Sequence, residues 1–147
     1  MVNLMNEPDL TTQILLTVVT LGYSLIPSIA DFNKTHATNP LWTGHARYHV
    51  VWQVSSYIFL ALGVLYLIWA PSEDYVFRLE LAGLCAIAVY GGFFAALFAL
   101  PLYNGRTADV NGVPMVKITD TLIIDLNIIV FTIMAIFLII AEYRMHA

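Results

Sequence analysis

The sequence has 147 residues, of which 60% are hydrophobic and only 11% are charged. This balance, with a mean hydropathy of +0.79, departs from the roughly 25% of charged residues in soluble domains and indicates an integral membrane protein. The net charge of −4 implies no particular partner, no nucleic-acid-binding signature is present, and the single cysteine, Cys85, excludes an intrachain disulfide or a Cys-x-x-Cys redox pair.

Four apolar segments have lengths close to the ~20 residues that cross ~30 Å of hydrocarbon. They cover about residues 11–30, 49–70, 75–102 and 116–141. The sequence therefore predicts one all-α domain over residues 1–147, an integral membrane, antiparallel four-helix bundle with an ordered polar loop between the first two helices. The chain before the first segment carries acids but no Lys or Arg, so this segment is expected to be a helix and not a cleaved signal peptide.

The connection between the first and second segments concentrates polar side chains in a chain that has few. Its ionisable and amide-bearing residues, with those of the following turn, include Asp31, His36, Asn39, His45, Arg47 and His49. Pro40 restricts the backbone, Gly44 lets it bend into the second helix, and Thr43 can cap that helix. We therefore expect residues 31–44 to form a fixed cap and not a slack linker.

The second helix carries a polar stripe at its loop end. His45, His49 and Gln53 fall within about 80° of one another on a helical wheel, so they share one face. His45 and His49 also have the i, i+4 spacing with which two imidazoles bind one metal. Asp31 and His36 could complete a ligand set suited to zinc or iron. The competing interpretations are metal-free acid–base chemistry and a plain role at the helix start and the lipid headgroups.

The third helix is expected to contribute packing and close approach through its small residues, among them Gly83, Gly91 and Gly92. Tyr90 falls near the middle of this segment. Its hydroxyl needs a hydrogen-bond partner, either in a site or on a backbone carbonyl.

The fourth segment carries the carboxylate that we expect deepest in the membrane. At about 1.5 Å per residue, Asp125 would lie ~13 Å along the helix from Val116, a depth similar to that of Gln53 measured from His45. A buried carboxylate needs a partner, and the histidines are candidates. The alternative is that Asp125 only hydrogen-bonds its helix to a neighbour, which contributes ~0.6–2 kcal/mol.

Counting spans places the two polar loops on one side of the membrane and both termini on the other. The basic residues on the loop side are Lys34, Arg47, Arg106 and Lys117, and those on the terminal side are Arg78 and Arg144. The excess on the loop side places the loop of residues 31–44 in the cytoplasm and the termini opposite.

The first loop and the start of the second helix form one long motif. It reads Asp31-x-Asn33-x-Thr35-His36-x-x-Asn39-Pro40-x-Trp42-x-x-His45-Ala46-Arg47-Tyr48-His49. This motif resembles the signature of an uncharacterised family of small four-span membrane proteins of fungi and bacteria, in which Phe is commoner at the position of Tyr48. The resemblance implies a preformed site at the first loop and names no reaction. A weaker, fold-level analogy links the chain to four-span proteins that process hydrophobic small molecules, such as sterol isomerases and anthrone oxygenases.

Two hypotheses for function follow. The first is a membrane-embedded enzyme that acts on a lipophilic small molecule from the bilayer, by acid–base isomerase-like or metal-assisted chemistry. The residues expected to carry the chemistry are His45, His49 and Asp125. Those expected to bind substrate are Asn39, Arg47 and Gln53, and the candidate ligands for Zn or Fe are His45, His49, His36 and Asp31. The second hypothesis is a non-catalytic lipid-binding protein or accessory subunit, in a homo-oligomer or a membrane complex.

Overall fold

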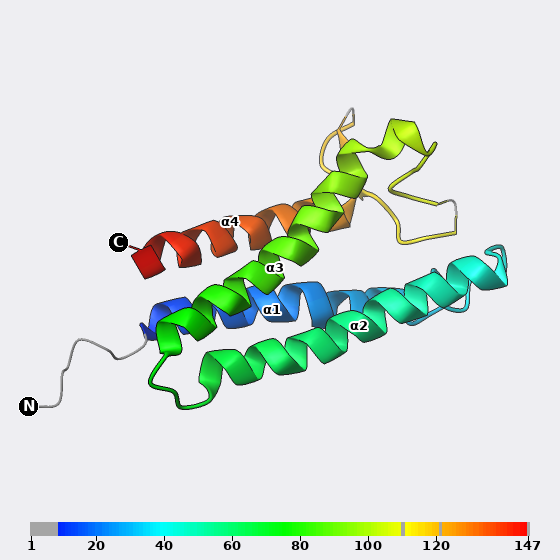
Figure 1. Cartoon of the computed structure of the whole chain (residues 1–147). Coiled ribbons are helices and arrows are strands. Elements are labelled where there is room, and N and C mark those ends of the chain that lie inside the picture. Colours follow the sequence, from blue (N-terminus) through cyan, green and yellow to red (C-terminus); the bar gives the residue numbers. More distant parts are fainter. Residues whose placement is uncertain (1–8, 110, 121, 147) are drawn as a thin grey trace, which may run out of the picture.

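The computed structural model describes residues 9–109, 111–120 and 122–146, and it confirms an all-α four-helix bundle. The helices of the described residues, which alternate in direction (Figure 1), are α1 (Leu10–Asp31), α2 (Gly44–Trp69), α3 (Tyr75–Phe98) and α4 (Leu126–His146). All four are long and apolar enough to cross a membrane. The chain is therefore a multi-pass integral membrane protein.

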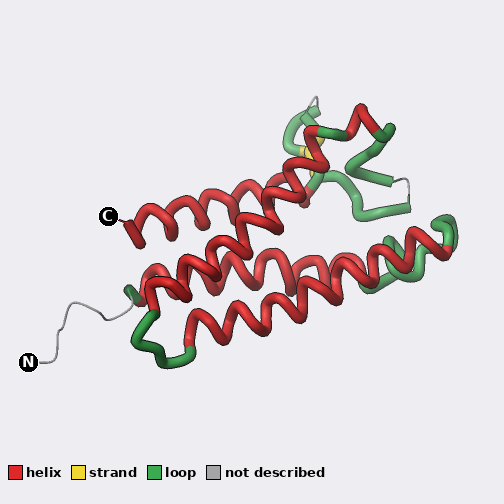
Figure 2. The backbone as a smooth tube through the Cα atoms, in the orientation of Figure 1, coloured by secondary structure: helices red, strands yellow, loops and turns green. Residues whose placement is uncertain are grey.

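Short elements gather at the end of the bundle where α1 gives way to α2 and α3 gives way to α4 (Figure 2). A 3-10 turn, η1 (Leu100–Leu102), follows α3, where Pro101 interrupts the helix. A two-stranded antiparallel hairpin, β1 (Val116–Lys117) and β2 (Ile123–Ile124), precedes α4. The start of α1, the end of α4 and the turn between α2 and α3 lie at the opposite end (Figure 1).

The core of the bundle is built around α1, which contacts each of the other three helices. Leu16, Val19 and Tyr23 of α1 are almost fully buried, with at most 1% of their surface exposed. Apolar side chains such as Phe59 and Ile139 instead cover the outer surface and are 74% and 66% exposed. Lipid tails solvate apolar side chains as well as a protein core does, so this exposure suits a bundle in a bilayer.

Helix α2 begins where the sequence predicts a cap. The Thr43 hydroxyl accepts a hydrogen bond from the Ala46 N–H at 3.2 Å, which satisfies one of the free donors of the first turn. At the other end of the bundle, the Asp9 carboxylate caps α1 in the same way.

The fourth helix starts ten residues later than predicted, at Leu126 and not at residue 116. Val116–Lys117 and Ile123–Ile124 pair as β1 and β2 instead. The sequence here is rich in β-branched residues, which fit a strand as well as a helix, so hydropathy could not distinguish the two. The helix start is set by Asp125, whose carboxylate accepts a hydrogen bond from the Asn127 N–H at 2.7 Å.

Two tyrosine hydroxyls are buried where α1 packs against α3, and only one of them forms a hydrogen bond between the helices. Tyr90 donates its hydroxyl to the Val19 carbonyl at 2.7 Å, whereas the Tyr23 hydroxyl has no hydrogen-bond partner among the described residues. We expect Tyr90→Phe to lower the free energy of unfolding by about 1 kcal/mol. Tyr23→Phe should be neutral or stabilising, because it removes a buried polar group that makes no bond. Equilibrium unfolding in detergent micelles measures both, and equal losses would contradict this account.

Candidate functional site

Loop 1, residues 32–43, is folded by short-range hydrogen bonds into the ordered cap that the sequence predicts. Asn33 organises it: its side-chain oxygen accepts from the Thr35 N–H at 2.8 Å, and its amide donates to the Ala30 carbonyl at 2.8 Å. The Ala37 N–H also returns to the Asp31 carbonyl at 2.9 Å. These bonds hold the loop over the end of the bundle.

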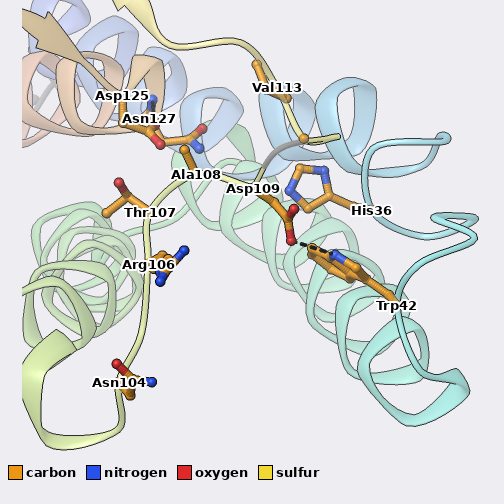
Figure 3. Close-up of a pocket in the computed structure, with 11 residues that line it drawn as sticks. His36, Trp42, Asn104, Arg106, Thr107, Ala108, Asp109, Val113, Asp125 and Asn127 are labelled. Atoms are coloured by element: carbon orange, nitrogen blue, oxygen red, sulfur yellow. Dashed lines mark hydrogen bonds between the residues drawn. The ribbon is translucent and has the colours of Figure 1, made fainter.

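Two contacts tie loop 1 to the described parts of loop 2, residues 103–125. Asn39, which is fully buried, and the half-buried Asn111 exchange amide hydrogen bonds, at 3.2 Å from Asn39 Nδ2 and at 2.6 Å from Asn111 Nδ2. The Trp42 indole N–H donates to Asp109 at 3.3 Å, the dashed line in Figure 3. Asn39, predicted to bind substrate, is therefore engaged in joining the loops, and it is not among the residues that line a cavity at this end.

The loop cavity, of about 390 Å³, lies between the two loops and the start of α4 (Figure 3). Loop 1 contributes His36 and Trp42, and the start of α4 contributes Asp125 and Asn127. Loop 2 adds the polar side chains of Asn104, Arg106, Thr107 and Asp109. The walls are thus mainly polar and contain both hydrogen-bond donors and acceptors.

The bundle cavity, of about 430 Å³, lies within the loop end of the bundle and is lined by residues of all four helices. Its polar side chains are Asp31, His36, Gln53 and Asn127. Its remaining walls are apolar or aromatic and are formed by Pro27, Tyr57, Gly92, Phe93, Ala96 and Phe131. Both cavities have volumes typical of small-molecule sites, which span about 300–1,000 Å³. Gln53, which the sequence analysis expects to bind substrate, is one of the lining residues.

His36 and Asn127 line both cavities, so the two cavities adjoin at these side chains. His36 Nδ1 lies 2.8 Å from the Thr35 hydroxyl and 3.4 Å from the Asp31 carboxylate. The imidazole also packs edge-on against the Trp42 ring, with centroids 5.1 Å apart. The histidine is therefore held on several sides at the junction.

The hydrogen bonds of Thr35 indicate which ring nitrogen of neutral His36 carries the proton. The Thr35 hydroxyl has one proton and two neighbours that can only accept it, Asn33 Oδ1 at 2.7 Å and the Ala30 carbonyl at 3.1 Å. Donation to either oxygen leaves a lone pair of the hydroxyl facing His36 Nδ1. This pattern favours the neutral tautomer that has its proton on Nδ1 and a free lone pair on Nε2.

His45 and His49 lie on the first turns of α2, which project beyond the other helices (Figure 1). Their Nε2 atoms are 3.0 Å apart, and both side chains are exposed. Like Arg47, they are absent from the residues that line the two cavities. Periodicity correctly puts the two histidines on one helix face, but it does not show how far a helix extends past its neighbours.

The four predicted metal ligands form two pairs and not one set. His36 pairs with Asp31 at 3.4 Å, and His45 pairs with His49 at 3.0 Å. Within residues 9–109, 111–120 and 122–146, no three His, Cys, Asp or Glu side chains are grouped so that they could hold a metal ion. The predicted zinc or iron site made by all four residues is therefore not formed by this arrangement.

Asp125 occupies a different place from the one expected. It is buried, with 6% of its surface exposed, but it precedes α4 as a cap and does not lie two turns inside a helix. The predicted match in depth with Gln53 is therefore wrong, because it was counted from a helix start that does not exist. Asp125 nevertheless lines the loop cavity.

The sequence analysis gave no site role to three residues that line a cavity, Asn127, Tyr57 and Arg106. Asn127 is the one side-chain amide in α4, which is a signal that the sequence contained, whereas the other two are found only from the packing. No protein-family model, curated protein or solved structure matches the chain.

Proposed function

We propose that this protein is a membrane-embedded enzyme that transfers protons on a lipophilic small molecule, with His36 as the base. The observation that supports this most directly is the Asp31–His36 pair at the junction of the two cavities. In this proposal, the catalytic role expected of His45 and His49 belongs to His36, with Asp31 as its supporting carboxylate.

The bundle cavity suits a lipophilic ligand that enters from the bilayer. Its inner walls include the aromatic rings of Phe93 and Phe131. The cavity is also lined by three exposed residues, Gln53 of α2 and Gly92 and Ala96 of α3. Helices α2 and α3 separate toward the loop end (Figure 1). A molecule dissolved in the membrane therefore has a lateral route to His36 that avoids the polar loops.

The chemistry follows from the tautomer of His36. Nε2 takes a proton from an acidic C–H bond of the ligand, and the electron pair of that bond moves into a neighbouring carbonyl or double bond. Asp31, 3.4 Å from Nδ1, stabilises the imidazolium that forms. Return of the proton to a different carbon completes an isomerisation, which consumes no oxidant, reductant or water.

Deuterium exchange tests this proposal without knowledge of the natural substrate. Geranylacetone, a lipophilic ketone with acidic C–H bonds beside its carbonyl, is incubated in D₂O with the purified protein in nanodiscs. We expect protein-dependent exchange at those carbons, and a loss of about 100-fold or more in His36→Gln, because a general base contributes roughly 10²–10⁴-fold. His146→Gln, at the far end of α4, is the control and should keep the wild-type rate. Equal exchange in wild type and His36→Gln would contradict the proposal.

A non-catalytic role in lipid binding or in a membrane complex is the second candidate. It is favoured by an exposed ring cluster at the start of α2, where Tyr48 and Trp52 lie 5.7 Å and 5.9 Å from the His49 ring and are 61% and 58% exposed. Exposed aromatic residues of this kind are common in interfaces with a partner or a second copy. Ligand binding without any protein-dependent exchange would favour this role.

The proposal also includes an orientation. Both loops lie at one end of the bundle and the two described chain ends at the other (Figure 1). The excess of Lys and Arg at the loop end supports placing that end, with both cavities, in the cytoplasmic half of the membrane.

A further inference from the structure

We propose that the ligand is an amphiphile with a neutral, oxygen-bearing end, and that Asn127 binds this oxygen at the junction of the two cavities. This inference rests on the proposed function, because it names the class of molecule that fills the bundle cavity. It assigns a role to a side chain that lies beside His36 in both linings.

The position of Asn127 is fixed while its side chain remains available. Its backbone N–H donates to the Asp125 carboxylate at 2.7 Å, which anchors it at the start of α4. Among the described residues, none forms a hydrogen bond with its side-chain amide. Figure 3 shows this amide at the wall of the loop cavity, across from His36. An amide offers two donors and one acceptor without charge, so it can recognise a carbonyl or a hydroxyl group.

The two cavities differ in the polarity of their walls, which favours a ligand that has one apolar and one polar end. The bundle cavity presents Phe93 and Phe131, whereas the loop cavity presents mainly polar side chains. At roughly 30 Å³ per water-sized group, 430 Å³ accommodates on the order of 14 non-hydrogen atoms. An apolar body of this size fits the bundle cavity and leaves its polar end at Asn127.

The charges around the junction favour a neutral end over an anionic one. The loop cavity is lined by two carboxylates, Asp109 and Asp125, and one guanidinium, Arg106. Asp31 adds a further carboxyl group on the side of the bundle cavity. A carboxylate or phosphate on the ligand would face this excess of acidic groups, and like charges repel.

Asn127 and His36 can then act on one functional group. If the ligand end is a carbonyl, the side-chain amide of Asn127 donates a hydrogen bond to its oxygen. His36 Nε2 meanwhile removes a proton from the adjacent carbon. The C–H electron pair forms the carbon–carbon double bond of an enolate, and the carbonyl oxygen gains the negative charge. A donor already placed at that oxygen stabilises the charge as it develops.

Binding of matched probes tests the role of Asn127. Geranylacetone and the hydrocarbon farnesene are titrated against the full-length protein in detergent micelles, and the bound fraction is measured by native mass spectrometry. We expect the wild type to prefer the ketone about tenfold, the value of one well-placed hydrogen bond. Asn127→Leu and Asn127→Asp, neither of which offers the neutral amide donor, should bind both probes alike. Thr132→Val is the control and should keep the wild-type preference, because Thr132 is an exposed polar residue of α4 that lines neither cavity.

The outcomes separate this inference from the function on which it rests. A preference for the ketone that persists in both Asn127 variants overturns the inference alone, and so does tighter binding of farnesoic acid than of geranylacetone. Failure of the wild type to bind either probe, or binding that is unchanged when a leucine replaces Gly92 in the bundle cavity, overturns both. Thermal unfolding of the Asn127 variants shows that they are folded, and Asn127→Asp keeps the size of the native side chain.

Discussion

Gly92→Leu is expected to abolish binding of geranylacetone and the protein-dependent deuterium exchange while the four-helix fold is kept. Gly92 lines the bundle cavity, and a Cβ at this position meets no atom within 4 Å. The four added carbons occupy on the order of 120 Å³ at roughly 30 Å³ each, which removes over a quarter of the 430 Å³ cavity. The helix itself should gain about 0.5–1 kcal/mol, because glycine is a poor residue in a helix interior.

Gly91→Leu is the matched control for this substitution. Gly91 is also exposed, and a Cβ there also meets no atom within 4 Å, but it is not among the residues that line the bundle cavity. The neighbouring residue points about 100° away around the helix, so its leucine should face lipid. Native mass spectrometry and the exchange rate should be those of the wild type. Loss of binding in both variants, or in neither, would contradict the assignment of the bundle cavity as the ligand site.

Asn39→Leu is expected to release loop 1 from loop 2 and to have the largest effect on stability. The buried Asn39 amide makes four hydrogen bonds, to the Thr35 carbonyl, to the Leu41 N–H and, in both directions, to Asn111. Leucine has a similar size and replaces none of them. We expect a loss of roughly 2–4 kcal/mol in the local stability of the loops, because several buried groups are left unsatisfied.

Hydrogen exchange followed by mass spectrometry measures this loss directly. Protection of the loop 1 amides should fall by about 30-fold or more, while the helix cores keep theirs. Lys34→Ala, at an exposed position of the same loop, should change little. The double variant Asn39→Leu/Asn111→Leu should lose less local stability than the sum of the losses in the two single variants. The two side chains bond each other, so the second substitution removes a group that the first has already left without this partner. Strictly additive losses would show that the two side chains act independently.

The first-loop motif contains two residues that line the bundle cavity, Asp31 and His36, and two that do not, His45 and His49. His36 and Asp31 stand out in the sequence as polar groups beside apolar segments, and both line the bundle cavity. The sequence analysis predicts His36 and Asp31 as metal ligands, in one set with His45 and His49. The separation of these residues into two pairs depends on how far α2 extends beyond the other helices, and the spacing of the histidines does not record this.

What the sequence determined by itself is the class of fold. Apolar segments of membrane-spanning length can satisfy their backbone polar groups in a bilayer only as helices or closed barrels, and their number sets which loops share a side. Local chemistry was also readable, as in the Thr43 cap and in the need of Tyr90 for a partner, because both depend on neighbours in the helix or on a single buried hydroxyl.

Only the tertiary structure shows where the two cavities lie and which residues line them. Hydropathy cannot separate a β-branched hairpin from a helix, so the true start of α4, and with it the position of Asn127, lay beyond a reading of the sequence. The bundle cavity draws on all four helices, so it depends on how they pack together. Distances between helices depend on how their side chains pack against each other. A sequence pattern shows which residues lie on the same face of one helix, but it does not show which residues of another helix pack against that face.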